Sequence, residues 1–340
     1  MNEEIKMVPV VHTLFVWDFD WTIVNCNSDE YIPGQFIQDE NELNTRFQQL
    51  YESTQQDWHA CVQAIIRQVM EQSSPYRSTP DAIMTAARKM PYLTGVRSAL
   101  DIVYNCRTTE SSGDGGGSGS GGGRTTGQMI LSDGNTLFIG AFLEANGLNN
   151  HFTHGVISNE GKWIPLSGDS DDQKDTIQLE VVHQSQQYGG HSCDRCPKNL
   201  CKTQALQHVL EQHFSATTCD DEKGTRKNRP QRIVYVGDGA NDACPALHVL
   251  TESDVLLART GRKRRNANGR AGPETDKEAM TDGMQGGTFG ILSALRNREQ
   301  EGGEMQRGPK CQVLEWSTGD ELMNHVTKLI EDLQAITVQE

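Results

Sequence analysis

Two carboxylates follow a short run of strand-forming residues near the start of the chain. Asp18 and Asp20 belong to the motif DFDWT, which ends at Thr22 and directly follows the mostly apolar residues 11–17. Two carboxylates that converge in a buried site repel each other and lose hydration, so they need a cation beside them. Mg²⁺ prefers carboxylates, water and substrate phosphate as ligands. One carboxylate can then attack phosphorus, while the other transfers protons as general acid and base.

A second acidic motif, GDGAND at residues 237–242, comes directly after the β-forming residues 232–236. Its glycines permit a tight turn that brings the backbone close to a ligand. Asp238 and Asp242 can add metal ligands or orient metal-bound water. An Asp-Gly pair is also common in ordinary turns, but its occurrence together with the first motif favours a shared metal site.

Two further residues can complete a phosphate site. Ser132 ends the predicted strand 128–131, where its hydroxyl and backbone N–H can donate to phosphate oxygens. Lys202 lies early in a predicted helix and can neutralise the group in transfer. Each is a weak signal alone, because a single Ser or Lys is usually part of the solvated surface.

The elements that would position these residues alternate between strands and helices. Short apolar runs predict further strands at residues 155–158, 254–257 and 313–316, and the last is followed by a helical pattern over 321–333. Such alternation predicts an α/β fold with a Rossmann-like parallel sheet, in which the site lies beyond the carboxyl ends of the strands.

Apolar residues recur at three- and four-residue steps after the first motif, so residues 31–90 are predicted to form a small helical cap domain inserted after the first strand. Segments 8–30 and 91–335 form the predicted core. Polar and Gly-rich stretches predict disordered insertions within the core, at about 107–127, 167–190, 218–230 and 260–287. The basic run 259–270 is interpreted as a solvated loop, with phosphate or RNA contact as the alternative.

The bulk composition bounds the partners and the compartment. A net charge of −15 and a pI of about 5.1 argue against a nucleic-acid or anionic-membrane surface. The sequence contains no apolar run of membrane-spanning length, and its acidic first residues argue against a signal peptide. Nine scattered cysteines suit reduced intracellular thiols better than a disulfide framework. These features predict a cytoplasmic protein without a nucleic-acid or membrane partner.

Taken together, these motifs resemble the haloacid dehalogenase-like hydrolases and, more narrowly, are similar to the phosphoethanolamine/phosphocholine phosphatase family. The narrower similarity covers most of residues 11–258 and rests on DFD at 18–20, NSD at 27–29, ILSD at 130–133, HSC at 191–193, RCP at 195–197, Asn199, CK at 201–202 and YVGDGAND at 235–242. One departure is Trp21, which replaces a residue that is often small in the family. It could alter access near the nucleophile.

The resemblance implies a Mg²⁺-dependent phosphatase that cleaves small phosphomonoesters through an aspartyl-phosphate intermediate. It implies the following roles: Asp18 as nucleophile and metal ligand, Asp20 as acid/base and metal ligand through its backbone carbonyl, Asp238 as metal ligand, Asp242 in the inner or second metal shell, Thr22, Ser132 and Lys202 as phosphate-binding residues, and Asp29 and Asp133 facing the substrate head group. A carboxylate attracts a cationic head group. Tyr31, Tyr51 or Trp58 could add cation–π contacts, although core packing is the simpler interpretation of each.

Several alternatives remain open at this point. Pyridoxal phosphate, phosphoserine and inorganic pyrophosphate are rival substrates, and a non-catalytic binding protein with the same fold is the rival of another class. Filled catalytic positions argue against that last alternative. Separately, Cys193, Cys196 and Cys201 with His191 could bind Zn²⁺, but the spacing is irregular and lacks a second CxxC. The simpler interpretation is that these cysteines shape the loop that delivers Lys202.

Overall fold

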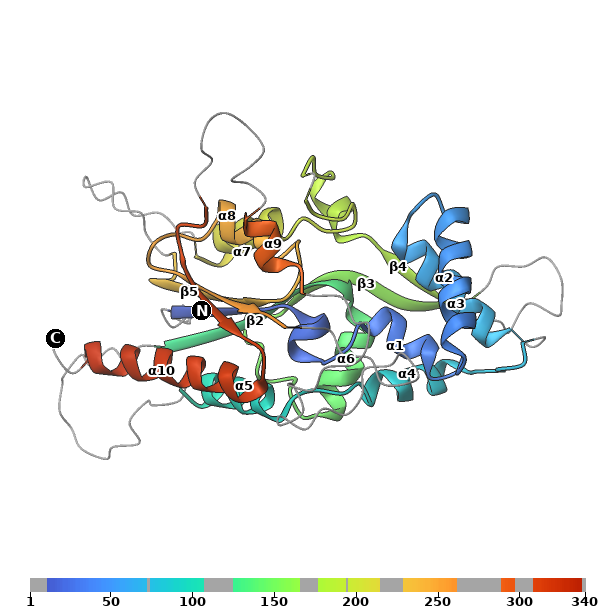
Figure 1. The fold of residues 1–340 in the computed structure, drawn as a ribbon, viewed down its shortest axis with the longest axis horizontal. Coiled ribbons are helices and arrows are strands. Elements are labelled where there is room, and N and C mark those ends of the chain that lie inside the picture. Colours follow the sequence, from blue (N-terminus) through green and yellow to red (C-terminus); the bar gives the residue numbers. More distant parts are fainter. Residues whose placement is uncertain are drawn as a thin grey trace, which may run out of the picture.

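A twisted sheet forms the centre of the computed structural model, which describes residues 11–71, 74–106, 125–165, 177–193, 195–214, 229–261, 289–296 and 308–337. The sheet has seven strands in the order β4-β3-β2-β1-β5-β6-β7 (Figure 1). Their bounds are β1 Val11–Trp17, β2 Thr125–Asn135, β3 Val156–Pro165, β4 Ile177–Val182, β5 Arg232–Gly237, β6 Val255–Arg259 and β7 Gln312–Trp316. Neighbouring strands are parallel except for β3 and β4, which pair antiparallel. The predicted α/β fold with a parallel sheet is confirmed.

Helices cover both faces of the sheet, which explains why its central strands are apolar along their whole length. Successive side chains of β1 point to opposite faces: Phe15 and Trp17 pack with one buried cluster, and Leu14 and Val16 pack with the other. The first cluster includes side chains of α5 Thr94–Cys106 and α10 Gly319–Thr337. The second lies under α7 Lys202–Phe214, α8 Ala243–His248 and α9 Ile291–Arg296, on the opposite face (Figure 1).

Four helices follow β1 and lie together at one end of the molecule (Figure 1). They are α1 Ser28–Gly34, α2 Glu40–Ser53, α3 Trp58–Met70 and α4 Pro80–Arg88. Each begins after a side chain that accepts a hydrogen bond from a free N–H of the first turn, the caps being Asn27, Asp39, Asp57 and Thr79. The helices α2, α3 and α4 lie within the predicted cap range 31–90, and α1 crosses its lower bound. The division into a cap and a core domain stays a prediction.

The hairpin formed by β3 and β4 extends from the sheet to the helices of this end (Figure 1). The Arg67 guanidinium of α3 donates to Gln178 Oε1 of β4 over 2.6 Å, and the backbone N–H of Val181 donates to Gln63 Oε1 over 3.1 Å. Leu179 and Val181 are buried on the same side. One edge of the sheet therefore continues into the helical end.

The predicted insertions at 107–127 and 167–190 are wrong in part. Strand β2 already begins at Thr125, and the second range contains both β4 and a 3₁₀ helix, η3 Gln184–Tyr188. The sequence of β4, IQLEVV, alternates only weakly between apolar and polar residues, and the polar residues on both sides of it weaken the prediction of a strand. The strand is stable because it pairs with β3 and covers α3, which is tertiary information. Most of 107–127, 218–230 and 260–287 lies outside the described residues.

Arg259 also departs from the prediction, because it is buried at the end of β6 rather than exposed in a solvated loop. From residue 262 onward the remainder of the basic run lies outside the described residues. In the described part of the chain, no helix is both long enough and apolar enough to cross a membrane.

Candidate active site

Three acidic residues meet beyond the carboxyl ends of β1 and β5. Asp18 is the first residue after β1, and its backbone N–H donates to Val236 O of β5 over 2.9 Å. Asp238 follows β5, and Asp242 ends the same turn. One carboxylate oxygen from each of the three lies within 4.8 Å of the others, and all three residues are buried. Oxygens at this separation can be bridged by one hard cation.

Lys202 supplies the positive charge of this cluster. It is the first residue of α7, early in a helix as predicted, and it is fully buried. Its Nζ lies 2.6 Å from Asp242 Oδ1 and 2.8 Å from Asp18 Oδ1, the latter an ion pair by distance without hydrogen-bond alignment. Burial alone would lower the pKa of Lys202, but attraction to Asp18 and Asp242 outweighs it and raises the pKa.

The charges of this cluster do not balance without a further cation. Three ionised carboxylates and one ammonium leave two negative charges, which equals the charge of one divalent ion. Without that ion, desolvation and then the charge of Asp242 raise the pKa of Asp18 well above its ordinary value. Both the donor set and the charge therefore fit Mg²⁺.

Asp242 is saturated with hydrogen-bond donors. Its Oδ1 accepts from Lys202 Nζ at 2.6 Å and from the Tyr235 hydroxyl at 2.8 Å. Its Oδ2 accepts from the backbone N–H groups of Asp238 at 3.0 Å and Gly239 at 2.9 Å. Of the two metal positions considered for Asp242, the outer one fits this arrangement better, because the carboxylate already positions Lys202 and the turn.

Asp20 lies in a different environment from the three clustered acids. Its carboxylate accepts from Ser28, at 2.9 Å from the backbone N–H and at 3.1 Å from the hydroxyl. Desolvation and then the charge of Asp29 raise its pKa well above the ordinary value. A Cβ placed on Gly134 would lie 3.4 Å from Ser132 Oγ and 3.9 Å from Asp20 Oδ2, so these groups border one small space. A side chain at position 134 would fill it.

The predicted phosphate ligands Thr22 and Ser132 are both buried. Ser132 Oγ accepts from the backbone N–H of Gly134 over 3.2 Å, which leaves its hydroxyl hydrogen available. Thr22 Oγ1 has no hydrogen-bond partner among the residues that the structure describes. An unsatisfied buried hydroxyl costs about 1–3 kcal/mol, and a phosphate oxygen would remove that cost.

The two predicted head-group residues lie close to this space. Asp29 Oδ2 accepts from the Trp58 indole N–H over 2.8 Å, while Asp29 Oδ1 is buried and has no hydrogen-bond partner within the described part of the chain. Burial raises the pKa of Asp29 to about 7, although the Trp58 hydrogen bond opposes the shift. The Asp133 carboxylate accepts from Asn241 Nδ2 over 3.0 Å. The charge of Asp29 and, less strongly, that of Asp133 raise the pKa of Asp20, and the charge of Asp133 also raises the pKa of Asp18.

A cavity of about 470 Å³ adjoins these residues at the start of α3. Tyr51 and Trp58 form part of its wall, together with His59, His183 and residues 196–199. Trp58 and His59 connect the cavity to the acids, because Trp58 bonds Asp29 and His59 Nε2 lies 3.1 Å from the Asp133 carbonyl oxygen. The cavity is large enough for a small organic group.

Several polar contacts of the site were not predicted from the sequence. The Asp133 carbonyl accepts from Asn159 Nδ2 at 2.7 Å and from Asn199 Nδ2 at 3.2 Å, in addition to its contact with His59. Tyr235 shortly precedes the GDGAND motif and Asn241 lies within it, so their positions could have marked them as residues of the site. Asn159 and His59 are single polar residues far along the chain, and nothing in their spacing marks them.

Arg259 fixes the turn that carries the first motif. Its guanidinium donates to the Trp21 carbonyl and, over 2.7 Å, to Asn25 Oδ1, and it lies 4.6 Å from the Phe289 ring centroid. Trp21 adopts a left-handed conformation with φ 57° and packs edge-on against Phe289 at 6.1 Å. The large side chain at position 21 therefore packs into the protein, with 7% of its surface exposed.

Known phosphatases are similar to this chain in sequence. The sequence profile of the family described as "Putative Phosphatase" matches residues 123–271. Over these residues the chain is similar to that family of phosphatases. It is a phosphatase, and the alternative of a non-catalytic binding protein is set aside.

Three proteins illustrate the sequence similarity of this chain to known enzymes. Mouse "Pyridoxal phosphate phosphatase PHOSPHO2" is 29% identical over 248 residues, which span 73% of this chain and 82% of the mouse protein. The zebrafish "Probable phosphatase phospho1" is 24% identical over 330 residues, or 95% of this chain and 89% of that protein. "Inorganic pyrophosphatase 2" of Arabidopsis thaliana is 24% identical over 253 residues, or 72% and 70%. All three names describe the hydrolysis of phosphate compounds, but they give different substrates or none.

Proposed function

We propose that this phosphatase hydrolyses small phosphomonoesters with a cationic leaving group, phosphoethanolamine and phosphocholine first among them. The observation that carries the proposal is the buried Asp29 Oδ1, which has no hydrogen-bond partner in the described residues and lies on a carboxyl whose other oxygen is held by Trp58. An ammonium or trimethylammonium group would compensate this charge. Trp58 and Tyr51 line the adjoining cavity, where a cation can also lie against aromatic faces.

The reaction proceeds in two steps on Asp18. In the first, an Asp18 oxygen attacks phosphorus, the bond from phosphorus to the ester oxygen breaks, and Asp20 gives its proton to the departing alcohol. The raised pKa of Asp20, caused first by burial, suits an acid that must hold a proton near neutral pH. Lys202, Thr22 and Ser132 bind the phosphoryl oxygens and stabilise the charge that develops on them. The product of this step is an aspartyl phosphate.

In the second step, water attacks the phosphorus of the aspartyl phosphate. Asp20, now ionised, takes the proton from that water, and inorganic phosphate leaves while the Asp18 carboxylate is restored. Asp20 can serve in both steps because Ser28 holds its carboxylate through two hydrogen bonds.

Mg²⁺ is the cofactor that we propose for this site. Asp18, Asp238 and the backbone carbonyl of Asp20 would hold it, with Asp242 orienting the turn and Lys202. When bound, the ion neutralises the carboxylates and the phosphoryl group, so that an anionic nucleophile can approach an anionic substrate. The two excess negative charges of the cluster support this assignment.

We further propose that residues 31–90 act as a cap that selects the leaving group, because α3 supplies Trp58 and His59 to the cavity. Pyridoxal phosphate is the second candidate substrate. The aromatic wall of the cavity could stack on its ring, and the name of the mouse relative points to the same compound. Phosphoserine and pyrophosphate fit less well, since each would place an additional anion near Asp29.

Steady-state kinetics with phosphocholine, phosphoethanolamine, pyridoxal phosphate, phosphoserine, pyrophosphate and p-nitrophenyl phosphate tests the proposal. We expect kcat/KM to be highest for the first two. We also expect Asp29→Asn to lower kcat/KM for those two selectively. A charge pair at about 4 Å contributes about 1–4 kcal/mol as the effective dielectric constant falls from water to a protein surface, so the expected loss is about fivefold to about 700-fold.

Asp57→Asn is the matched control, because Asp57 lines the same cavity and asparagine can keep its cap on α3. This variant should leave the selectivity for cationic esters unchanged. A preference of the wild type for pyridoxal phosphate would overturn the assignment of an amino-alcohol substrate. An equal loss for all substrates in Asp29→Asn would show that Asp29 does not read the head group.

A further inference from the structure

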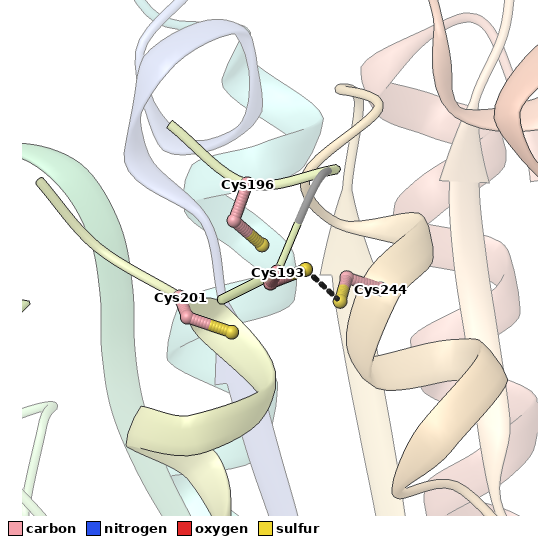
Figure 2. Close-up of side chains that lie close together, drawn as sticks. All are labelled: Cys193, Cys196, Cys201 and Cys244. Atoms are coloured by element: carbon pink, nitrogen blue, oxygen red, sulfur yellow. Dashed lines mark hydrogen bonds between the residues drawn. The ribbon is translucent and has the colours of Figure 1, made fainter. Parts of the chain in front are cut away.

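Four cysteine side chains from separate parts of the chain point toward one another beside the active site (Figure 2). Cys193 and Cys196 lie in the loop between η3 and α7, Cys201 directly precedes α7, and Cys244 belongs to α8. All four sulfurs lie within 4.8 Å of one another, and Cys193 Sγ lies 3.5 Å from Cys244 Sγ. Cys244 is thus a fourth member beside the three cysteines that the sequence analysis considered as possible zinc ligands.

His191, which the sequence suggested as the fourth ligand, has another role. Its Nδ1 accepts from the backbone N–H of Cys193 over 3.2 Å, and its Nε2 donates to the Pro197 carbonyl oxygen over 2.9 Å. Both ring nitrogens are therefore engaged within the loop. His191 shapes the segment that carries two of the cysteines, and Cys244 occupies the fourth position around the sulfurs.

Ordinary packing does not explain this cluster. Among the described residues, its buried members are Cys196, Cys201 and Cys244, with Cys193 packed against them, and no other apolar side chain belongs to it. A disulfide is not formed either, because all four are free and a bond would need a sulfur separation of about 2.05 Å. Zinc–sulfur bonds of about 2.3 Å in a tetrahedron place the sulfurs about 3.8 Å apart. The observed separations need only small adjustments to meet that value.

A hydroxyl group beside the cluster also contacts one of the sulfurs. The Thr203 hydroxyl donates to Cys244 Sγ over 3.0 Å, the kind of outer contact that orients and stabilises a metal-bound sulfur. A thiolate is the ligand form that a metal requires.

We propose that Cys193, Cys196, Cys201 and Cys244 bind one structural Zn²⁺ ion. Binding would release the thiol protons to solvent, and four protein ligands would leave no open position for chemistry on the metal. Cys201 directly precedes Lys202, and Cys244 comes two residues after Asp242. The ion would therefore tie the start of α7 to α8 and hold the Lys202–Asp242 pair in register. This proposal does not depend on the substrate of the phosphatase.

A second group of possible ligands, Asp57, His59 and His183, has to be separated from this one in any metal analysis. His59 Nδ1 lies 3.1 Å from Asn199 Nδ2 and its Nε2 lies 3.1 Å from the Asp133 carbonyl oxygen, so its ring nitrogens are already engaged. The Asp57 carboxylate caps α3. A His183→Asn variant removes one ligand of this group without touching the cysteines.

Metal content of the full chain, expressed with added zinc and purified under reducing conditions without chelator, tests the proposal. We expect about one zinc per chain by plasma mass spectrometry in the wild type, in His183→Asn and in Cys106→Ser. Cys106 is a half-buried cysteine outside the cluster and serves as the matched control. Cys193→Ser and Cys244→Ser should each lose at least nine-tenths of the zinc. Cys193 is only partly buried, so its variant is expected to fold, which circular dichroism checks.

X-ray absorption at the zinc edge provides the second measurement and does not require a variant. A shell of four sulfurs at about 2.3 Å would support the proposal. A wild type without zinc, zinc retained in both Cys193→Ser and Cys244→Ser, a shell of nitrogen and oxygen, or a disulfide among the four cysteines by peptide mass spectrometry would each overturn it.

Discussion

Replacement of Asp242 by asparagine separates a positioning role from a metal-binding role. The carboxylate accepts four hydrogen bonds, two on each oxygen. Asparagine has only one acceptor oxygen. If that oxygen faces the backbone N–H groups, its amide N–H₂ opposes the Lys202 ammonium and the Tyr235 hydroxyl. In the flipped orientation the N–H₂ opposes the backbone donors instead.

The magnitude follows from this count. Either orientation of the asparagine leaves about two buried donors without an acceptor, at about 1–3 kcal/mol each, and one charge of a buried ion pair is removed, which costs about 3–5 kcal/mol when a partner is lost. Because Lys202 keeps Asp18, we take the lower end. The lower ends of these ranges give an expected loss of about 5 kcal/mol, divided between the free energy of unfolding and kcat, with kcat lower by at least about tenfold.

The assays are urea unfolding and Mg²⁺-dependent hydrolysis of p-nitrophenyl phosphate. Tyr235→Phe is the control, because it removes one donor to the same oxygen and should cost only about 1 kcal/mol. The apparent Mg²⁺ activation constant of Asp242→Asn should change by less than its kcat. This variant could instead keep wild-type stability and wild-type kcat at saturating Mg²⁺ but need a hundredfold more of the ion. Asp242 would then be a direct metal ligand, and its four hydrogen bonds would not keep it out of the inner shell.

Three other perturbations have expected outcomes. Gly95→Ala would place a Cβ against the Gly319 carbonyl carbon where α5 meets α10, closer than van der Waals contact allows, so chemical denaturation should show a loss of about 1–3 kcal/mol. Gly140→Ala has nothing within 4 Å of its Cβ and should gain about 0.5–1 kcal/mol. The pKa of Asp29 is raised to about 7, so KM for phosphocholine should fall as pH rises through neutrality and Asp29→Asn should flatten that profile. At pH values between the ordinary pKa of an aspartate and about 7, Asp29 is protonated in the folded state and ionised in the unfolded state. The free energy of unfolding should therefore fall as pH rises across that window in the wild type, and should fall less in Asp29→Asn. Treatment with a chelator should abolish phosphate release, with recovery on addition of Mg²⁺; activity that persists after complete removal of divalent ions would contradict the proposed cofactor.

The parts of the fold and site that the sequence predicts are those encoded locally. Asp18 and Asp238 directly follow apolar strand segments, and in a parallel sheet such positions converge at one edge. Lys202 begins a helix with regular apolar spacing. Each of these residues could therefore be placed from its own neighbours, and the structure brings them to contact distance of Asp242.

The features that the sequence did not predict depend on distant partners. Strand β4 has weak alternation of its own and is held by β3 and α3. Cys244 joins the other cysteines only because α8 packs near the start of α7. Arg259 belongs to a run whose composition suggests a solvent-exposed loop, yet it is buried and its guanidinium donates to the carbonyl of Trp21 and the side chain of Asn25. No local pattern reports such long-range compensation.

Direct identification of the phosphorylated residue tests the central claim. The enzyme is mixed with phosphocholine and Mg²⁺, quenched in acid within one turnover and reduced with borohydride, which converts an aspartyl phosphate to homoserine. Peptide mass spectrometry should then find homoserine at position 18, in the wild type and in Asp29→Asn, and Asp18→Asn should show neither modification nor turnover. Phosphate release by Asp18→Asn at a rate near that of the wild type, or modification at any other acid, would contradict the account.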